Sequence, residues 1–539
     1  MSRILGDEVR AHLDRISLIR PLGYVFLLFC VVYISLKNDV YFDDAFITLA
    51  YSRNLAAGEG MVYRPGEAVL GTTTPLWCWL NALPFLVIDA ERLGSLGCRL
   101  WFMVATLGAA IGIARLARRG GFGHWGLLGA AGYVLQPAHH ILFGSEVSLA
   151  VWLACEGLVA FSRGRALGAG LLAGLLILTR PEAGCLAALL FIGFVIGHRA
   201  WHHPVRFLIG SAIILIPALA YLTHAFGSPL PNTLAAKQAQ LGAGGHTPWA
   251  ISMGLGTWRF IVVEWLRGPF LPAFLSVLGV IWIGRSSWDS FRSKAEDRLA
   301  RCAFFLAFVW GIVHVAALTT LGIAFYRWYL YPLWLAVMLA LSAGAAASWR
   351  WMQERAASSP ESHGRPTSLP GAVAVAIVIM LLIGWQARWT GDPPSLQRER
   401  HHGYVQLAAK MEALAAGQPA EVLAYEVGAL GFHLPNNISV LDEFYLVRPM
   451  PEDRKLPTRD QLIAQARPRF IVETLPIRND LTQEARAEMM ARTAPSFRLF
   501  YPTGVNNRTI AYLPVDYSRN AYGLQILFDR DIEAESRMP

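Results

Sequence analysis

Residues 18–46 read LIRPLGYVFLLFCVVYISLKNDVYFDDAF. Residues 18–36 of this stretch are mainly apolar, and a helix that crosses a bilayer needs about 20 such residues. The preceding residues 1–17 are polar and mixed in charge, and no small-residue cleavage site follows the apolar run, unlike the pattern of a removable signal peptide. The sequence therefore predicts a retained first membrane span, and two adjacent carboxylates, Asp43 and Asp44, follow it closely.

Further apolar runs predict a polytopic α-helical membrane protein. Only 16% of the 539 residues are charged, against roughly 25% in a soluble globular protein. The net charge of +9 does not indicate a nucleic-acid partner, because the arginines fall in short clusters between apolar runs, as membrane topology requires. The lipid bilayer is the expected surrounding of about eleven transmembrane helices, at 18–36, 96–117, 124–142, 147–163, 166–179, 182–198, 205–223, 269–284, 302–321, 328–347 and 370–388.

The arginine clusters set the predicted orientation. With the N-terminus and its Arg3, Arg10 and Arg15 inside, every Arg-rich connection falls on the inner side, which agrees with the positive-inside rule. Residues 74–90 are also apolar, but a crossing there would move the later clusters outside. We therefore expect an interfacial helix there, within a first outer loop at 37–95. These features predict a multi-pass protein of the bacterial inner (cytoplasmic) membrane.

The composition changes at about residue 389. The tail is polar and contains strand-like runs at Glu421–Tyr425, Arg469–Glu473 and Thr509–Leu513, which are rich in residues that favour strands. The chain is thus predicted to contain a transmembrane catalytic domain at 1–388 and a soluble α/β domain at 389–539. Because the last of eleven predicted spans runs outward, this second domain is expected on the periplasmic (extracytoplasmic) face.

Charged residues gather at the outer ends of the predicted spans and in the outer loops. A carboxylate there can take a proton from a hydroxyl nucleophile, and a cation can stabilise a phosphate leaving group. Two histidines near the outer end of the third predicted span could reach the same site. The candidate site residues are the carboxylates Asp43, Asp44, Glu146 and Glu182, the cations Arg180, Lys237 and Arg327, and the histidines His139 and His140.

Simpler interpretations of these residues stay open. Asp43 or Asp44 could cap the helix predicted to follow them, and Arg180 with Glu182 could form an ion pair only. A transporter is the competing class of protein, but transporters often show paired half-repeats and charges at mid-membrane. Charges at one face of the membrane, and no matching halves, favour an enzyme. The absence of a P-loop or GxGxxG motif argues against a cytosolic nucleotide donor bound in those ways.

Over roughly residues 40–340 the chain resembles the GT-C glycosyltransferases, and within them the arabinofuranosyltransferase B type of actinobacterial cell-wall enzymes. One departure is the step at 144–146, where related sequences often read Ser-Gly-Leu-Glu. The resemblance rests on the order of the motifs, which are Asp43-Asp44, Arg53-Asn54-Leu55 with Gly58 and Gly60, Pro65-Gly66-Glu67, a Thr-rich step before Trp77, Gly144-Ser145-Glu146, Arg180-Pro181-Glu182, Pro231-Asn232-Thr233 to Lys237, and Arg327.

The resemblance implies an inverting, integral-membrane glycosyltransferase with the GT-C fold. Its donor would be a polyprenyl-phosphate sugar, and its acceptor a cell-envelope glycan or lipid on the outer face. Asp43 or Asp44 would be the catalytic base, Lys237 and Arg327 would bind the donor phosphate, and Arg180 is a further candidate. Arabinofuranose is one option for the sugar. The alternative is a hexose moved to lipid A or protein. The motifs name no cofactor, and a divalent cation (Mg²⁺, Mn²⁺ or Ca²⁺) held by Asp43 and Asp44 is left open.

Overall fold

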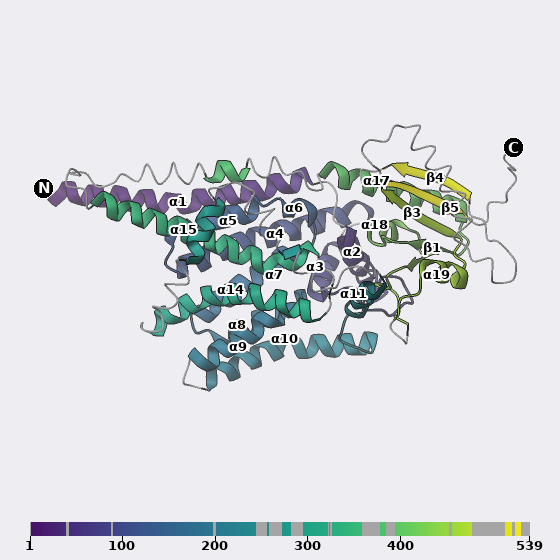
Figure 1. Cartoon of the computed structure of the whole chain (residues 1–539), viewed down its shortest axis with the longest axis horizontal. Helices are drawn as coiled ribbons and strands as arrows, with labels where there is room; N and C mark the ends of the chain where they lie inside the picture. Colours follow the sequence, from purple (N-terminus) through teal and green to yellow (C-terminus); the bar gives the residue numbers. More distant parts are fainter. Residues whose placement is uncertain are drawn as a thin grey trace.

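The computed structural model describes residues 2–38, 43–87, 90–197, 201–243, 256–257, 272–281, 295–321, 323, 326–357, 378–383, 394–451, 455–476, 513–519 and 523–529. Long helices lie side by side along the longest axis of the molecule (Figure 1). A small sheet with its own helices lies at one end of this bundle, and helix α1 begins at the other end (Figure 1).

Five helical segments in the described part of the chain are long and apolar enough to cross a membrane. They are Arg20–Lys37, Leu96–Arg119, His202–Phe226, Cys302–Thr320 and Arg327–Arg355. Four shorter apolar helices accompany them, at Val147–Ser162, Ala166–Thr179, Pro181–Gly197 and Pro272–Ile281. The bundle elements have the bounds α1 Ser2–Lys37, α4 Ala90–Arg119, α7 Val147–Ser162, α8 Ala166–Thr179, α9 Gly184–Gly197, α10 His202–Phe226, α14 Ala295–Thr320 and α15 Tyr331–Ala357.

These helices coincide with all but two of the predicted spans. The predicted span 124–142 is not one helix: it forms a 3-10 turn η1 (Gly123–Trp125), α5 (Gly126–Val134) and α6 (Ala138–Ile141). Pro137 separates α5 from α6, because proline lacks the N–H that a continuing helix needs. Of the predicted span 370–388, the described residues 378–383 are helical. The number of eleven crossings stays a prediction.

Helices α8 and α10 approach each other closely through glycines. A Cβ atom added to Gly170 would lie 2.0 Å from the carbonyl oxygen of Phe207, and one added to Gly210 would lie 2.3 Å from that of Leu167. Small residues at such contacts allow helices to pack backbone against backbone within a membrane. These contacts lie in the first half of α8, and Arg180 follows the last residue of this helix.

Three shorter helices lie between the bundle and the sheet (Figure 1). They are α2 (Asp43–Ala56), α3 (Pro75–Phe85) and α11 (Asn232–Ala243). The helix predicted over 74–90 corresponds to α3, and Pro75 stands at its first position, where a missing N–H costs nothing. Helix α2 is buried along most of its length, so its residues are held from several sides.

The sheet has five strands in the order β2-β1-β3-β5-β4. Strand β1 pairs in parallel with β2 and β3, while β5 pairs antiparallel with β3 and β4. The predicted strands 421–425 and 469–473 correspond to β1 and β3, and of the predicted run 509–513 only Leu513 is described, at the start of β4. The bounds are β1 Ala420–Ala424, β2 Ile438–Asp442, β3 Phe470–Pro476, β4 Leu513–Arg519, β5 Gly523–Asp529, α17 Pro394–Ala415, α18 Gly428–His433 and α19 Arg459–Ala466.

Buried hydrogen bonds join this sheet unit to the segment that follows α2. The Tyr63 hydroxyl donates to the carbonyl oxygen of Val427 over 2.6 Å. The Arg64 guanidinium donates to the carbonyl oxygen of Pro435 over 3.0 Å. Buried polar groups of this kind are costly to leave unpaired, so the sheet unit has a defined position over α2.

Candidate active site

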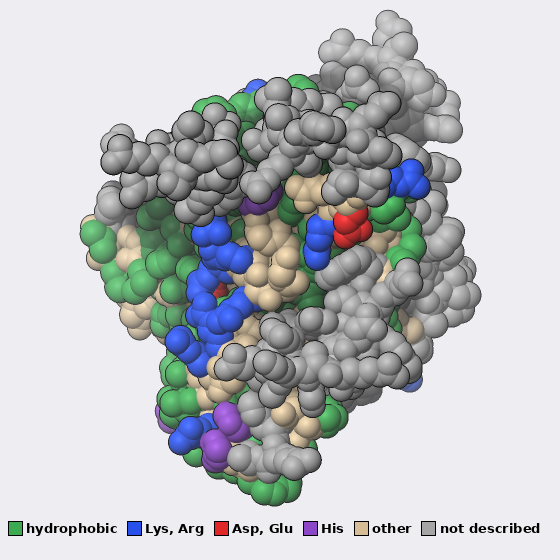
Figure 2. All heavy atoms as spheres, turned by 90° about the vertical axis from the view of Figure 1, so that its left-hand side faces the viewer, with side chains coloured by type: hydrophobic (Ala, Val, Ile, Leu, Met, Phe, Trp, Pro, Cys, Tyr) green, Lys and Arg blue, Asp and Glu red, His purple; other side chains and the backbone are tan. Residues whose placement is uncertain are grey.

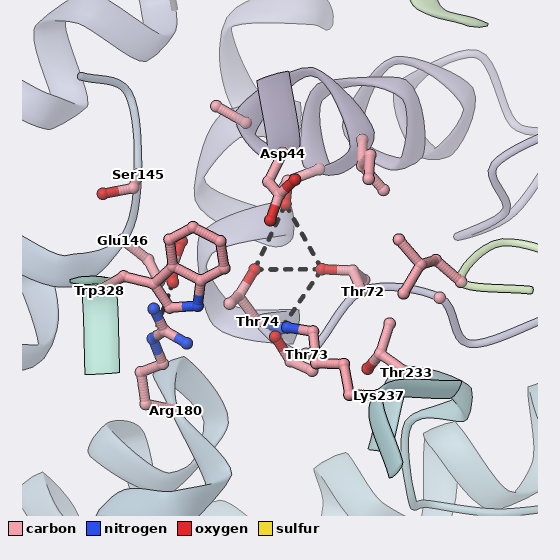
Figure 3. Close-up of a pocket in the computed structure, with 15 residues that line it drawn as sticks. Asp44, Thr72, Thr73, Thr74, Ser145, Glu146, Arg180, Thr233, Lys237 and Trp328 are labelled. Carbon is pink, nitrogen blue, oxygen red and sulfur yellow. Dashed lines mark hydrogen bonds and ion pairs between the residues drawn. The ribbon is translucent and has the colours of Figure 1, made fainter. Parts of the chain in front are cut away.

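A cavity lies between the short helices α2 and α11 and the ends of the bundle helices (Figure 3). It encloses about 570 Å³ of space free of protein atoms, its open mouth included. Four charged residues line it, namely Asp44, Glu146, Arg180 and Lys237. Residues that are far apart in the sequence therefore meet in one place.

The two adjacent aspartates at the start of α2 have different surroundings. Neighbouring residues on a helix point about 100° apart, and only Asp44 lines the cavity. The Asp43 carboxylate instead accepts hydrogen bonds from the backbone N–H of Ala429 at 2.9 Å and of Gly428 at 3.2 Å. These N–H groups open helix α18, so Asp43 caps that helix. The cap considered from the sequence was on the helix that follows the aspartates, whereas Asp43 binds the first N–H groups of a helix in the sheet unit.

The side chain of Asp44 is partly buried where it lines the cavity. Burial raises the pKa of Asp44 to about 6, an increase that the nearby Lys237 ammonium limits and the Asp43 charge adds to. A carboxylate with this pKa is mostly ionised at pH 7 and is a stronger base than an ordinary aspartate. Asp44 can therefore accept a proton from a hydroxyl group bound in the cavity.

Lys237 extends from α11 toward the threonines and Asp44 (Figure 3). Its ammonium donates a hydrogen bond to the Tyr329 hydroxyl over 3.2 Å. It also lies 5.3 Å from the ring centroid of Tyr326 and 5.5 Å from that of Trp328, distances typical of cation–π contacts. Burial alone would lower the pKa of Lys237, but Tyr329 and Asp44 raise it above its usual value. The cavity thus contains a permanent positive charge.

Arg180 follows the last residue of α8 in an extended conformation. Its Nε atom lies 2.8 Å from Glu146 Oε1, and its Nη1 atom lies 3.3 Å from Glu182 Oε1. The side chain is only 4% exposed, so both carboxylates are needed to balance a buried charge. The predicted Arg180–Glu182 ion pair is present, and Glu146 extends it to a triad. Two carboxylates already neutralise the charge of Arg180. Of the two cations that line the cavity, Lys237 is therefore the better candidate to bind an anion.

The turn that carries Glu146 is held in place by α3. The indole N–H of Trp77 donates to the carbonyl oxygen of Gly144 over 3.0 Å. Gly144 has a φ of +86°, which glycine adopts without strain. The interfacial helix predicted from the sequence therefore helps to position one carboxylate of the site.

The remaining predicted site residues lie elsewhere or outside the described side chains. Arg327 starts the 3-10 helix η4 (Arg327–Leu330), and it is not among the residues that line the cavity. His139 is buried and contacts the Tyr133 carbonyl oxygen at 2.8 Å. The His140 side chain lies outside the described part of the structure. The roles first assigned to these residues stay predictions.

The structure adds uncharged residues that the sequence did not single out as site residues. Thr48 lies one helical turn after Asp44, and its hydroxyl is 3.5 Å from those of Thr72 and Thr74. Trp328 and Leu446 also line the cavity. The Thr-rich step before Trp77 was a visible signal for the threonines. No local signal marks Leu446, which comes from the sheet unit.

A cation that bridges Asp43 and Asp44, which the sequence left open, would compete with hydrogen bonds that Asp43 already accepts. Both carboxylate oxygens of Asp43 accept backbone N–H groups of α18. A cation shared by the two aspartates would have to replace these hydrogen bonds. Among the described residues, no group of three or more His, Cys, Asp or Glu side chains is placed to hold a metal ion. The question of a divalent cation, which the sequence left open, is not tested by this geometry.

The helical bundle and its appended sheet have the fold of the GT-C class of membrane glycosyltransferases, as the order of motifs predicted. The chain is similar to ArnT from Cupriavidus metallidurans in the apo state, with a TM-score of 0.56, 16% identity and coverage of 96% of this chain and 98% of ArnT. It is also similar to an oligosaccharyltransferase from Archaeoglobus fulgidus, with a TM-score of 0.54, 12% identity and coverage of 93% and 73%.

The sequence comparison is more local. Over 217 residues the chain is 28% identical to the terminal β-(1→2)-arabinofuranosyltransferase of Mycobacterium tuberculosis (strain ATCC 25618 / H37Rv). The alignment covers 36% of this chain and 35% of that enzyme, so it spans about a third of the curated relative. No protein-family profile matches the chain.

Proposed function

We propose that this protein is an integral-membrane inverting glycosyltransferase that moves a sugar from a polyprenyl-phosphate donor to a hydroxyl group of a cell-envelope glycan or lipid. The observation that carries the proposal is the pairing of a partly buried base, Asp44, with a partly buried cation, Lys237, in one cavity. Structures with this fold include ArnT with bound undecaprenyl phosphate and AglB with a dolichol phosphate, and these ligands support a lipid-phosphate donor here.

The chemistry follows from these two side chains. Asp44 takes the proton of the acceptor hydroxyl group. At the same time, the oxygen of that hydroxyl group attacks the anomeric carbon of the donor sugar. The bond from that carbon to the phosphate oxygen breaks, and its electron pair leaves with the phosphate. Lys237 stabilises the negative charge that develops on the leaving group. Attack from the face opposite the phosphate inverts the configuration at the anomeric carbon.

The charge distribution supports an outer location for the cavity. Lys and Arg side chains gather on the end of the bundle that faces away from the sheet (Figure 2). Arg119 and Arg165 lie close enough to Arg163 to interact electrostatically with it, so arginines of two connections lie close together. Because positive loops stay in the cytoplasm, we place this end inside. The cavity and the sheet unit then lie on the periplasmic face of the inner membrane.

The donor sugar is proposed from the sequence comparison. The local likeness to an arabinofuranosyltransferase makes arabinofuranose the first donor to test. A hexose moved to lipid A or protein is the second. The fold is that of transferases rather than of carriers, so the transporter is the least supported reading.

Replacing Lys237 with Ala is expected to weaken binding of polyprenyl phosphate by about 10-fold to 100-fold, because charged hydrogen bonds contribute about 1.5–3 kcal/mol. Native mass spectrometry of the detergent-purified protein with undecaprenyl phosphate measures the retained lipid. Arg327→Ala is measured beside it, because the resemblance implies a phosphate-binding role for Arg327 although this cation does not line the cavity. Lipid retention that is indifferent to Lys237→Ala would remove the phosphate site from this cavity.

The transfer rate is expected to depend on pH through Asp44. The base must be deprotonated, and burial raises its pKa to about 6. Activity should therefore be nearly constant above pH 7 and fall about tenfold per pH unit well below pH 6. A profile of kcat/KM from pH 5 to pH 8 in nanodiscs tests this. A profile that stays flat down to pH 5 would contradict the role of Asp44.

A further inference from the structure

One wall of the cavity, called the uncharged wall, is formed by hydroxyl groups and one apolar side chain, and the charged Lys237 lies at its edge (Figure 3). It consists of Thr72, Thr73 and Thr74 before α3, Thr233 of α11 and Leu446 of the sheet unit. Thr233 lies across the cavity from Arg180 and Glu146, which form the charged wall (Figure 3). The two walls therefore offer different chemistry to a ligand.

The hydroxyl group of Thr233 lacks a hydrogen-bond partner among the described residues, although Thr233 is only 6% exposed. Buried hydroxyl groups in folded proteins are nearly always hydrogen-bonded. The neighbouring Thr72 and Thr74 hydroxyls, in contrast, are 3.1 Å apart and bonded to each other. Ser145 is the other cavity-lining residue with a buried, unpartnered hydroxyl in this part of the structure, and it belongs to the charged wall. Among the described residues of the uncharged wall, Thr233 thus has the buried hydroxyl without a protein partner.

The position of Thr233 is fixed by its neighbour Asn232. The Asn232 backbone N–H donates to the carbonyl oxygen of Leu70 over 2.8 Å. Its side-chain amide donates to the carbonyl oxygens of Tyr445 at 2.6 Å and of Arg448 at 2.7 Å. Thr233 and Lys237 are four residues apart and so share one face of α11. One rigidly held helix therefore presents both a cation and a free hydroxyl to the cavity.

The sheet unit supplies the loop that receives Asn232. The Asp442 carboxylate, at the end of β2, is fully buried. It accepts the backbone N–H groups of Phe444 at 2.9 Å and Val447 at 3.0 Å. This folds residues 443–448 into a turn that presents the Tyr445 carbonyl oxygen to Asn232 and Leu446 to the cavity. The uncharged wall is thus built jointly by the membrane unit and the sheet unit.

We infer that this uncharged wall is the acceptor subsite and that the Thr233 hydroxyl binds a hydroxyl group of the acceptor sugar. The inference rests on the proposed transferase function. A neutral sugar suits this wall, because hydroxyl groups pair with sugar hydroxyls and the apolar Leu446 covers a sugar face. The donor phosphate contacts the Lys237 ammonium on the side of Trp328, whose ring centroid lies 5.5 Å from that ammonium. Thr48 lies on the same face of α2 as Asp44, and its hydroxyl contacts those of Thr72 and Thr74 in the uncharged wall. An acceptor sugar bound at this wall therefore lies next to Asp44, which can take the proton of the sugar hydroxyl.

The test compares Thr233→Val, which keeps the shape and removes the hydroxyl, with Thr233→Ser, which keeps the hydroxyl. The probes are a synthetic octyl di-arabinofuranoside acceptor and polyprenyl-phosphoryl-arabinofuranose, or the corresponding hexose pair if wild type uses it. Loss of a neutral hydrogen bond should raise the acceptor KM about threefold to tenfold in Thr233→Val. Thr233→Ser should restore the wild-type KM. Retention of undecaprenyl phosphate in native mass spectrometry should be equal in all three proteins.

Each contrary result has a separate meaning. An unchanged acceptor KM in Thr233→Val, with wild type active, overturns the acceptor subsite and leaves the transferase standing. Weaker retention of undecaprenyl phosphate in Thr233→Val would mean that Thr233 binds the donor. This result also overturns the acceptor subsite. A wild-type protein that neither retains the lipid nor transfers either sugar refutes the proposed function itself, and the acceptor subsite with it.

Discussion

Replacing Asp44 with Asn is expected to lower the rate of sugar transfer by about 10²-fold to 10⁴-fold, the usual contribution of a general base. The amide has nearly the shape of the carboxylate but cannot accept the proton of the acceptor hydroxyl. The fold should tolerate this change, because Asn has nearly the size of Asp and the partly exposed Lys237 ammonium keeps its hydrogen bond to the Tyr329 hydroxyl. The measurement is the initial rate of transfer from polyprenyl-phosphoryl-arabinofuranose, with the hexose donor in parallel.

Asp43→Asn is the matched control, since it is the same substitution one residue earlier. Its expected effect is on stability, because Asp43 caps α18 of the sheet unit and loss of a cap costs about 0.5–2 kcal/mol. The apparent melting temperature in detergent should fall slightly, while transfer should change far less than in Asp44→Asn. Equal loss of transfer in both variants, or full activity of Asp44→Asn, would contradict the assignment of Asp44 as the base.

The second large effect is expected at Arg180. Arg180→Met leaves Glu146 and Glu182 buried without their cation, and breaking a buried ion pair typically costs about 3–5 kcal/mol. We expect a strong decrease in apparent melting temperature and in the yield of monodisperse protein. Thermal denaturation of the protein purified in detergent, followed by near-ultraviolet circular dichroism, measures this.

A triple variant provides the control for Arg180. Combining Arg180→Met with Glu146→Gln and Glu182→Gln removes all three charges, so no unpaired charge is left buried. The triple variant should recover most of the stability lost in Arg180→Met, although not the activity. If the triple variant is no more stable than the single variant, the loss arises from packing of the Arg180 side chain and not from charge imbalance.

Much of the bundle could be predicted from local sequence, because a membrane span is defined by a continuous apolar run. The failure at 124–142 has a physical reason. Hydropathy measures how apolar a segment is, whereas Pro137 decides whether it stays one helix, and α5 ends at Val134. In the sheet, apolar runs identified β1 and β3. The order β2-β1-β3-β5-β4 depends on pairing between distant segments, which no local pattern specifies.

The candidate site was predictable in part for the same reason. Polar residues at the ends of apolar runs stand out, and four of them (Asp44, Glu146, Arg180 and Lys237) do line one cavity. The sequence could not distinguish Asp43 from Asp44, because the groups that bind Asp43 are about 385 residues away. Nor could it identify Leu446 as a wall of the cavity, since that contact depends on how the sheet unit docks.

The central claim is that the cavity between Asp44 and Lys237 holds the phosphate of a lipid-linked donor. The most direct test is a cryo-EM structure of the wild-type protein in nanodiscs with undecaprenyl phosphate. We predict phosphate density in hydrogen-bonding contact with the Lys237 ammonium, on the side of the cavity that Trp328 and Arg180 form, with the lipid tail leaving between the helices into the bilayer. Phosphate density at the Arg-rich end of the bundle, with the cavity empty, would contradict the account.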